Sequence, residues 1–172
     1  ADSLPIGTKT AITPVPVPYL AYEGMLVEIE GYAMVKTDGE AMSRQYAPET
    51  APGARPGKFC TGLRCGKMIF TSAQSAIDET GDLQGKNNII EQSGALAKNL
   101  QRALNHFGAE FDDVVKTNRW YSGGDDIDDF EPAALDFAAN FTEPGPAATG
   151  IPLPRHADPD ELIRVAVIAM IG

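Results

Sequence analysis

The sequence has few basic residues and no long apolar run. Lysine and arginine together number 14, against 24 aspartates and glutamates, which gives a net charge of −10. Nucleic acids and anionic membranes bind cationic surfaces, so neither is expected as a partner. No stretch approaches the roughly 18 apolar residues that span a bilayer, and no basic-then-apolar leader opens the chain. We therefore expect a cytoplasmic protein.

Residues that ligate metals are also scarce. The only cysteines are Cys60 and Cys65, and the histidines His106 and His156 stand alone. Because a structural zinc site needs four ligands and a catalytic one at least three, no metal is expected. A local disulfide is geometrically possible, but we predict two free thiols. His106 is predicted to lie near the C-terminus of a helix, where its partial positive charge suits the helix dipole.

An acidic run, Asp125 to Asp129, follows Gly123 and Gly124. It lacks the alternating ligand spacing and the distant bidentate Glu of a calcium loop. We predict instead that Asp128 or Asp129 caps the N-terminus of a helix.

Two helices are predicted in the last two thirds of the chain. Apolar residues recur at intervals of three and four from Asn87 to Phe107, and Gly108 follows where a left-handed C-cap belongs. A second, shorter helix carries Pro132 in its first turn, where the missing N–H costs little. Strand patterns flank both helices, at 67–72, 114–121, 149–154 and 162–171. Two helices on one face of a sheet give an α+β layer arrangement.

The N-terminal third contains two further extended patterns. Residues 11–17 and 26–34 alternate with a period of two and are rich in Val, Ile and Thr. Pro14, Pro16 and Pro18 fall on every second residue, so the first of these strands is predicted at a sheet edge. Residues 36–58 are polar and rich in Pro and Gly, which indicates a linker or lid.

The order of motifs from Gly66 to Gly150 resembles that of the YjgF/RidA family of imine and enamine deaminases. The chain has a strand ending in T-S-A-Q, a helix, the strand D-V-V-K-T, a helix after D-F, and the strand P-A-A-T. The resemblance implies a chorismate-mutase-like mixed sheet backed by two helices and a trimeric or pseudo-trimeric assembly. It also implies a pocket between neighbouring subunits that works without a metal or organic cofactor.

The two strand patterns of the N-terminal third resemble the last two strands of the same family. The segment A-I-T-P-V-P-V followed by L-V-E-I-E matches A-A-T-G-I-P-L followed by L-I-R-V-A near the end of the chain. We therefore predict the end of a preceding Rid-like copy at 1–35, a linker or lid at 36–58, and a complete copy at 59–172. The alternative is an N-terminal hairpin that only extends the sheet.

Several polar residues of the family pocket have no counterpart here. The Arg of the P-A-R motif, which binds a substrate carboxylate in the family, corresponds to Ala148 and, in the partial copy, to Ile12. Ser72, Ala73 and Gln74 stand for Ser-Gly-Gln, and Phe59 for a tyrosine. An Asn on the second helix corresponds to Ala134. The resemblance therefore argues against an α-imino carboxylate as substrate.

The remaining candidates are few. Glu28, Ser72 and Arg164 are predicted to be catalytic: Glu28 as a general base on water in a composite site, and Arg164 as an anion anchor. Each has a structural alternative, such as a solvated Arg164 or a Glu28 that pairs with a neighbouring subunit. The predicted substrate-binding residues are Phe59, Ala73, Gln74, Arg119, Trp120, Ala148 and Thr149, with Trp120 alternatively in the core or an interface.

The predicted function is that of a divergent hydrolase or deaminase acting on a small imine, enamine or related C–N bond. The alternative is a non-catalytic Rid-like subunit that completes an oligomer or binds a small ligand. The expected partners are a small-molecule substrate and either two further copies, in a homotrimer, or a chain that carries the first Rid-like copy.

Overall fold

A computed structural model describes residues 7–40, 42–48, 51, 53, 57–124 and 126–172. Its centre is a six-stranded mixed sheet in the order β2-β4-β5-β8-β6-β7. The strands are β2 (Arg44–Tyr46), β4 (Gly62–Cys65), β5 (Met68–Thr71), β6 (Val114–Tyr121), β7 (Ala147–Pro152) and β8 (Ile163–Met170). Within this sheet of the described residues, β6 and β7 run parallel and every other neighbouring pair is antiparallel. The predicted mixed α+β fold is confirmed.

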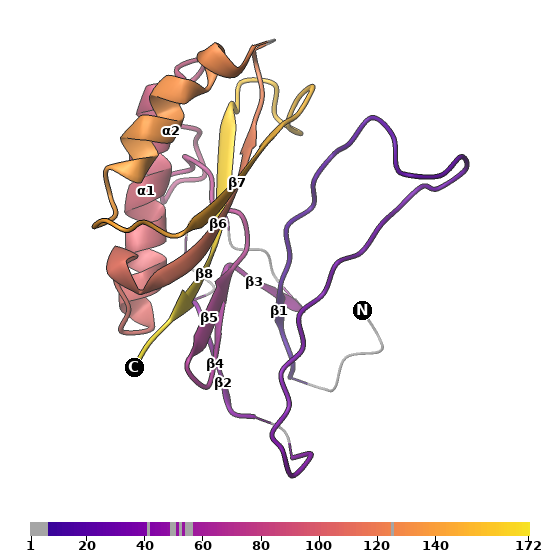
Figure 1. Cartoon of the computed structure of the whole chain (residues 1–172), viewed down its shortest axis with the longest axis vertical. Coiled ribbons are helices and arrows are strands. Elements are labelled where there is room, and N and C mark those ends of the chain that lie inside the picture. The colour runs from indigo at the N-terminus through magenta and orange to yellow at the C-terminus, as the bar shows by residue number, and fades with distance from the viewer. Residues whose placement is uncertain (1–6, 41, 49–50, 52, 54–56, 125) are drawn as a thin grey trace.

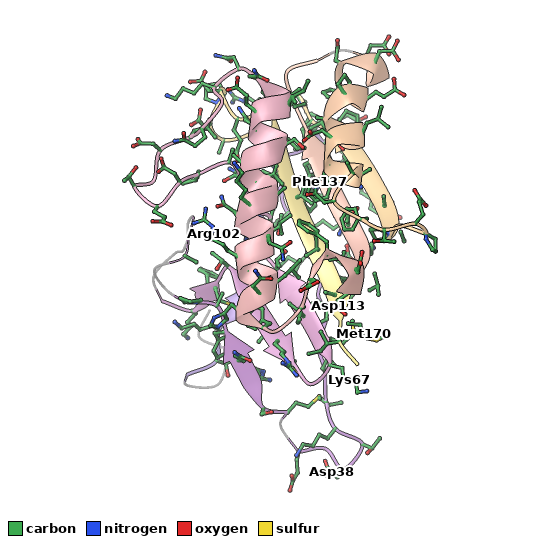
Figure 2. The ribbon with its side chains drawn as sticks, turned by 90° about the vertical axis from the view of Figure 1, so that its left-hand side faces the viewer. Asp38, Lys67, Arg102, Asp113, Phe137 and Met170 are labelled. Atoms are coloured by element: carbon green, nitrogen blue, oxygen red, sulfur yellow. The ribbon has the colours of Figure 1, made fainter. Side chains whose placement is uncertain are left out.

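Two helices cover one face of this sheet, α1 (Ile89–His106) and α2 (Glu131–Ala138), and they lie side by side in Figure 2. The core lies between them and the sheet, where Leu96 and Leu100 of α1 and Phe137 of α2 meet Ile163 and Val165 of β8. All five side chains are fully buried. Short 3-10 helices at Phe111–Asp113 and Ile127–Asp129 precede β6 and α2.

The C-terminal end of α1 agrees with the sequence prediction, and the N-terminal end of α2 does not. Gly108 has φ +75, the left-handed conformation expected after α1. For α2 the prediction was wrong, because Phe130 is the N-cap residue and provides no side-chain cap. Asp129 instead accepts a hydrogen bond from the Asp126 backbone N–H at 3.2 Å, which closes the turn before the helix. Asp125 lies outside the described residues.

The N-terminal third differs most from the predicted strands. Of residues 11–17, only Ala11 is in a strand, in the two-residue β1 (Thr10–Ala11), which pairs in parallel with β3 (Phe59–Cys60). Residues 17–35, which we call the arm, leave the body and return as two extended limbs (Figure 1). The limbs meet at a turn in which the Met25 N–H donates to the Tyr22 carbonyl at 3.2 Å. Within the described residues, no ladder pairs any part of the arm.

The predicted linker also contributes to the sheet. Within 36–58, β2 pairs antiparallel with β4 and forms one edge of the sheet. The other edge is β7, whose six residues are all exposed. No helix in the described part of the chain is long and apolar enough to cross a membrane.

Candidate functional site

A cavity lies on the face of the sheet opposite the two helices, where β5 runs into the turn Ser72–Gln74. Its volume is about 80 Å³, and since a water molecule needs about 10–15 Å³ by this measure, it suits a small ligand. The lining residues come from the N-terminal segment, from β3 and the turn that follows β5, and from β8: Ile12, Pro14, Gly53, Phe59, Cys60, Thr61, Ser72, Ala73, Gln74, Ser75, Ile77 and Arg164.

The N-terminal segment forms one wall of this cavity. The pairing of β1 with β3 brings Ile12 and Pro14 to the rim. Farther along, Thr13 Oγ1 accepts a hydrogen bond from the Ala73 backbone N–H at 2.8 Å. Val15 then packs on the small cluster of Trp120, Leu153 and Ala166. The cavity therefore lies between the predicted partial copy and the complete copy.

The turn after β5 is held by α1 and β8. Gln74 exchanges backbone hydrogen bonds with Val165 at 2.8 and 3.1 Å. From the other side, Asn99 on α1 donates through Nδ2 to the carbonyls of Ser75 and Ile77, at 2.8 Å each. These contacts fix the backbone that presents Ser72 and Gln74 to the cavity.

Uncharged hydrogen-bonding groups converge on one wall of the cavity. Gln74 Nε2 donates to the carbonyls of Thr61 and Ser72 and to Ser72 Oγ, at 3.1–3.2 Å. Ser72 Oγ in turn donates to the Thr61 carbonyl at 3.3 Å. Thr61 Oγ1 is buried and has no partner among the described residues. Because buried hydroxyls are rarely left unpaired, water or a ligand is the natural partner of this group.

Arg164, the charged residue in the described lining of the cavity, is paired with a carboxylate. Arg164 donates through Nε and Nη2 to both carboxylate oxygens of Glu161, with the Nε bond at 2.7 Å. The two side chains are 18% and 2% exposed. A bidentate pair of this kind occupies the guanidinium edge that would otherwise bind a carboxylate. Arg164 is therefore a paired and largely buried side chain rather than a solvated one, and its predicted role as an anion anchor stays a prediction.

Cys60 lines the cavity as a protonated thiol. Burial raises the pKa of Cys60 to about 11, against smaller lowering effects from the Gly62 backbone N–H and the charge of Lys9. Since the thiolate is the nucleophilic form, Cys60 is a poor nucleophile at neutral pH. Both cysteines are free, as predicted.

A second hollow adjoins the first beneath residues 13–16, and it is lined by Trp120, Leu153, His156 and Arg164. His156 is 2% exposed, and within the described residues its Nε2 has no hydrogen-bond partner. Burial lowers the pKa of His156; Glu161 and the Trp120 backbone act in the opposite direction, and Arg164 adds to the lowering. His156 is therefore a neutral imidazole.

The structure brings together about half of the predicted site residues. Phe59, Ser72, Ala73, Gln74 and Arg164 surround one cavity. The others lie apart: Trp120 at the second hollow, Arg119 on the helix face, Ala148 and Thr149 on the exposed edge strand, and Glu28 on the arm.

The position of Arg119 has a clear structural explanation. Arg119 Nη1 donates to the Ala134 carbonyl at 3.2 Å, and its guanidinium lies 5.0 Å from the centre of the Phe137 ring. It therefore supports α2. Ala134 belongs to the same side of the sheet, since it packs against the main core.

Three important groups were missed from the sequence, namely Thr61, His156 and Glu161. The spacing of Glu161 and Arg164, three residues apart at the start of a strand, was the available signal for their ion pair. Thr61 and His156 stand in segments whose patterns point to no particular partner. Among the described residues, no group of three or more His, Cys, Asp or Glu is placed to hold a metal ion.

Comparison with known proteins identifies relatives of the segment that contains the cavity. The family model Ribonuc_L-PSP, described as endoribonuclease L-PSP, matches residues 49–171. A RutC family protein of Pyrococcus abyssi is 31% identical over 114 residues, which are 66% of this chain and 86% of that protein. A RutC family protein of Saccharolobus solfataricus is 30% identical over the same shares of the two chains.

Solved structures show the same fold. A putative endoribonuclease from Thermotoga maritima superposes with a TM-score of 0.65 at 27% identity, covering 76% of this chain and 99% of that one. The YjgF gene product of E. coli superposes with a TM-score of 0.63 at 26% identity, covering 76% of this chain and all of that one.

Proposed function

Given that the chain belongs to the endoribonuclease L-PSP family, which includes the YjgF, RidA and RutC proteins, we propose that it is a divergent deaminase that hydrolyses a small imine or enamine. The observation that carries the proposal is the cavity around Ser72–Gln74, where uncharged hydrogen-bonding groups meet a neutralised Arg164. The substrate is accordingly small and weakly anionic or uncharged.

The reaction is the addition of water to a C=N bond. Water adds to the carbon and the nitrogen takes up a proton, which gives a carbinolamine. This intermediate then expels ammonia and leaves a carbonyl product. The Ser72 and Thr61 hydroxyls are suited to bind the substrate or the attacking water, because Ser72 is fixed by Gln74 and Thr61 Oγ1 is unpaired within the described structure.

Among the residues that the structure describes, the lining of the cavity includes no carboxylate that could act as the general base. We propose that Glu28 supplies this group in a composite site, because in the strand pattern L-V-E-I-E it stands where Arg164 stands in L-I-R-V. Glu28 is exposed on the arm and lies outside this chain's own cavity. Its site would therefore be formed with a second Rid-like domain.

The test compares two exposed arm glutamates in the protein assembly purified from its own cells. Ammonia release is measured with small imines, both carboxylated and uncharged, generated during the assay. Glu28→Gln is expected to lower kcat by about 100-fold or more, the range for loss of a general base. Glu23→Gln, an exposed arm glutamate with the same change of charge, is expected to leave kcat unchanged.

The second candidate function is a non-catalytic Rid-like subunit that binds a small ligand. It is favoured by Ile12 at the cavity rim, because the sequence resemblance matches Ile12 to the family's carboxylate-binding Arg. Binding of uncharged ligands without turnover, unaffected by Glu28→Gln, would support this function and refute the enzyme.

A further inference from the structure

The arm exposes apolar side chains in the alternating pattern of a buried strand. Leu26, Val27 and Ile29 are 96%, 70% and 85% exposed, and Val35 is 77% exposed. The limb from Leu26 to Val35 is extended and pairs with no strand in the described part of the chain (Figure 1). Tyr32 on this limb is in ring contact with Phe70 on β5. A row of exposed apolar residues with unpaired backbone groups is a template for pairing with another chain.

The repeat in the sequence identifies the place in a fold where this limb belongs. The chain distance from Ala11 to Leu26 equals that from Ala147 to Leu162, so 11–35 pairs with 147–171 without a gap. The pairing continues past the strand starts and places identical residues together: Ala11 with Ala147, Thr13 with Thr149, Pro16 with Pro152, Pro18 with Pro154, Ala21 with Ala157, Leu26 with Leu162, Ala33 with Ala169 and Met34 with Met170. Residues 26–35 are therefore a second version of β8.

The environment of β8 shows what such a strand requires. β8 is a central strand, with β5 on one side and β6 on the other. The counterparts of Val27, Ile29 and Ala33 are Ile163, Val165 and Ala169, all fully buried beneath the helices. The arm carries the same apolar face, but among the described residues of this chain nothing covers Val27 or Ile29.

A second copy of this chain has no vacant position between its β5 and β6 strands for the limb at 26–35. Its own β8 already pairs on both sides, with β5 and with β6. Strand addition to a second copy would be confined to the edges β2 and β7, where at least one face of the added strand remains outside the core. The partner must instead have counterparts of β5 and β6 with no strand between them.

We infer that the arm supplies the central, β8-like strand of a second Rid-like domain that lacks its own last two strands. Residues 11–16 stay with this chain, where they wall the cavity, and 26–35 insert between the β5-like and β6-like strands of the partner. Val27 and Ile29 face the partner's helices. Glu28 then takes the position that Arg164 has here, beside the partner's cavity.

The first experiment purifies the protein from its own cells through a tag after Gly172, followed by native mass spectrometry and hydrogen exchange. The expected assembly contains a Rid-like domain whose sequence stops before the counterpart of Ala147, and the backbone amides of 26–35 are protected. The inference is overturned if the assembly contains copies of this chain alone, whether the arm amides exchange freely or are protected between copies.

Variants test the contact without reference to turnover, so the outcome is independent of the proposed reaction. Val27→Asp with Ile29→Asp is expected to lower recovery of the partner by about tenfold or more, because each carboxylate would be buried without a partner charge. The variant itself should fold normally, since both side chains are exposed in this chain. Leu135→Asp is the matched control, because Leu135 is an exposed leucine on α2, away from the arm. Equal recovery with the arm variant and the control would overturn the inference.

Discussion

Replacement of Glu161 by Gln isolates the energetic role of the ion pair beside the cavity. The change preserves the shape of the side chain but removes the charge that both Nε and Nη2 of Arg164 contact. Glu161 is 2% exposed and Arg164 18% exposed, so the guanidinium would remain mostly buried without a counter-charge. Removal of one member of a buried pair costs about 3–5 kcal/mol. Because water reaches part of Arg164, we expect a loss of about 2–4 kcal/mol in the free energy of unfolding.

The assay is urea denaturation of the full chain. The loss in the free energy of unfolding is calculated from the shift of the transition midpoint, provided that the dependence of this free energy on urea concentration is unchanged. The control is Glu79→Gln, which removes a pair of comparable length, Glu79 to Arg102 at 2.8 Å, whose side chains are 78% and 50% exposed. Such surface pairs contribute about 0–1 kcal/mol. The double replacement of Glu161 and Arg164 by Met should cost less than Glu161→Gln alone, because it leaves no unpaired charge. Equal losses for Glu161→Gln and Glu79→Gln would refute the reasoning.

Two further predictions concern pH. The raised pKa of Cys60, from 9.0 to about 11, stabilises the fold as long as the thiol is neutral, so stability should fall as pH rises from about 9 to 11. Unfolding measured across this range should show a smaller fall for Cys60→Ala, and an unchanged fall would contradict the assignment. The lowered pKa of His156 means that the unfolded chain binds the proton more readily, so stability should decrease as pH falls below about 6.5. With His156→Gln, the free energy of unfolding should decrease less as pH falls below about 6.5. A decrease as large as in the wild type would show that other groups cause it.

Elements with a strong local pattern were predicted well. β6 has the predicted bounds, and α1 differs from its predicted range only at the ends, because long periodic segments bury one face whatever their neighbours are. By contrast, β2 is three residues long in a polar stretch, too short to show a period. The limb from Leu26 to Val35 has a clear strand pattern, but a pattern does not specify the strand that pairs with it.

The cavity was predictable where one motif supplied it and unpredictable where distant segments met. The turn Ser72–Gln74 and its neighbour Phe59 were found from the motif. Thr61 joins them only because β3 and β4 place it beside Gln74, whose Nε2 donates to the Thr61 carbonyl at 3.2 Å. Arg164 was predicted at the site, yet its ion pair with Glu161 changes what it can bind, and that contact depends on the course of the chain into β8.

The position of β8 in the sheet has a consequence for how the molecule is made. The sheet has two halves, β2-β4-β5 and β6-β7, which pair with each other only through β8. Strand β8 is also the last of these strands to be synthesised. Until β8 emerges from the ribosome, the newly made β5 and β6 segments lack their common neighbour, while the limb at 26–35 has already been made. Under the inferred match of this limb to β8, the order of synthesis would set up a competition between the two segments for the place between β5 and β6. Prompt capture of the arm by another domain would remove the competitor before the chain's own strand arrives.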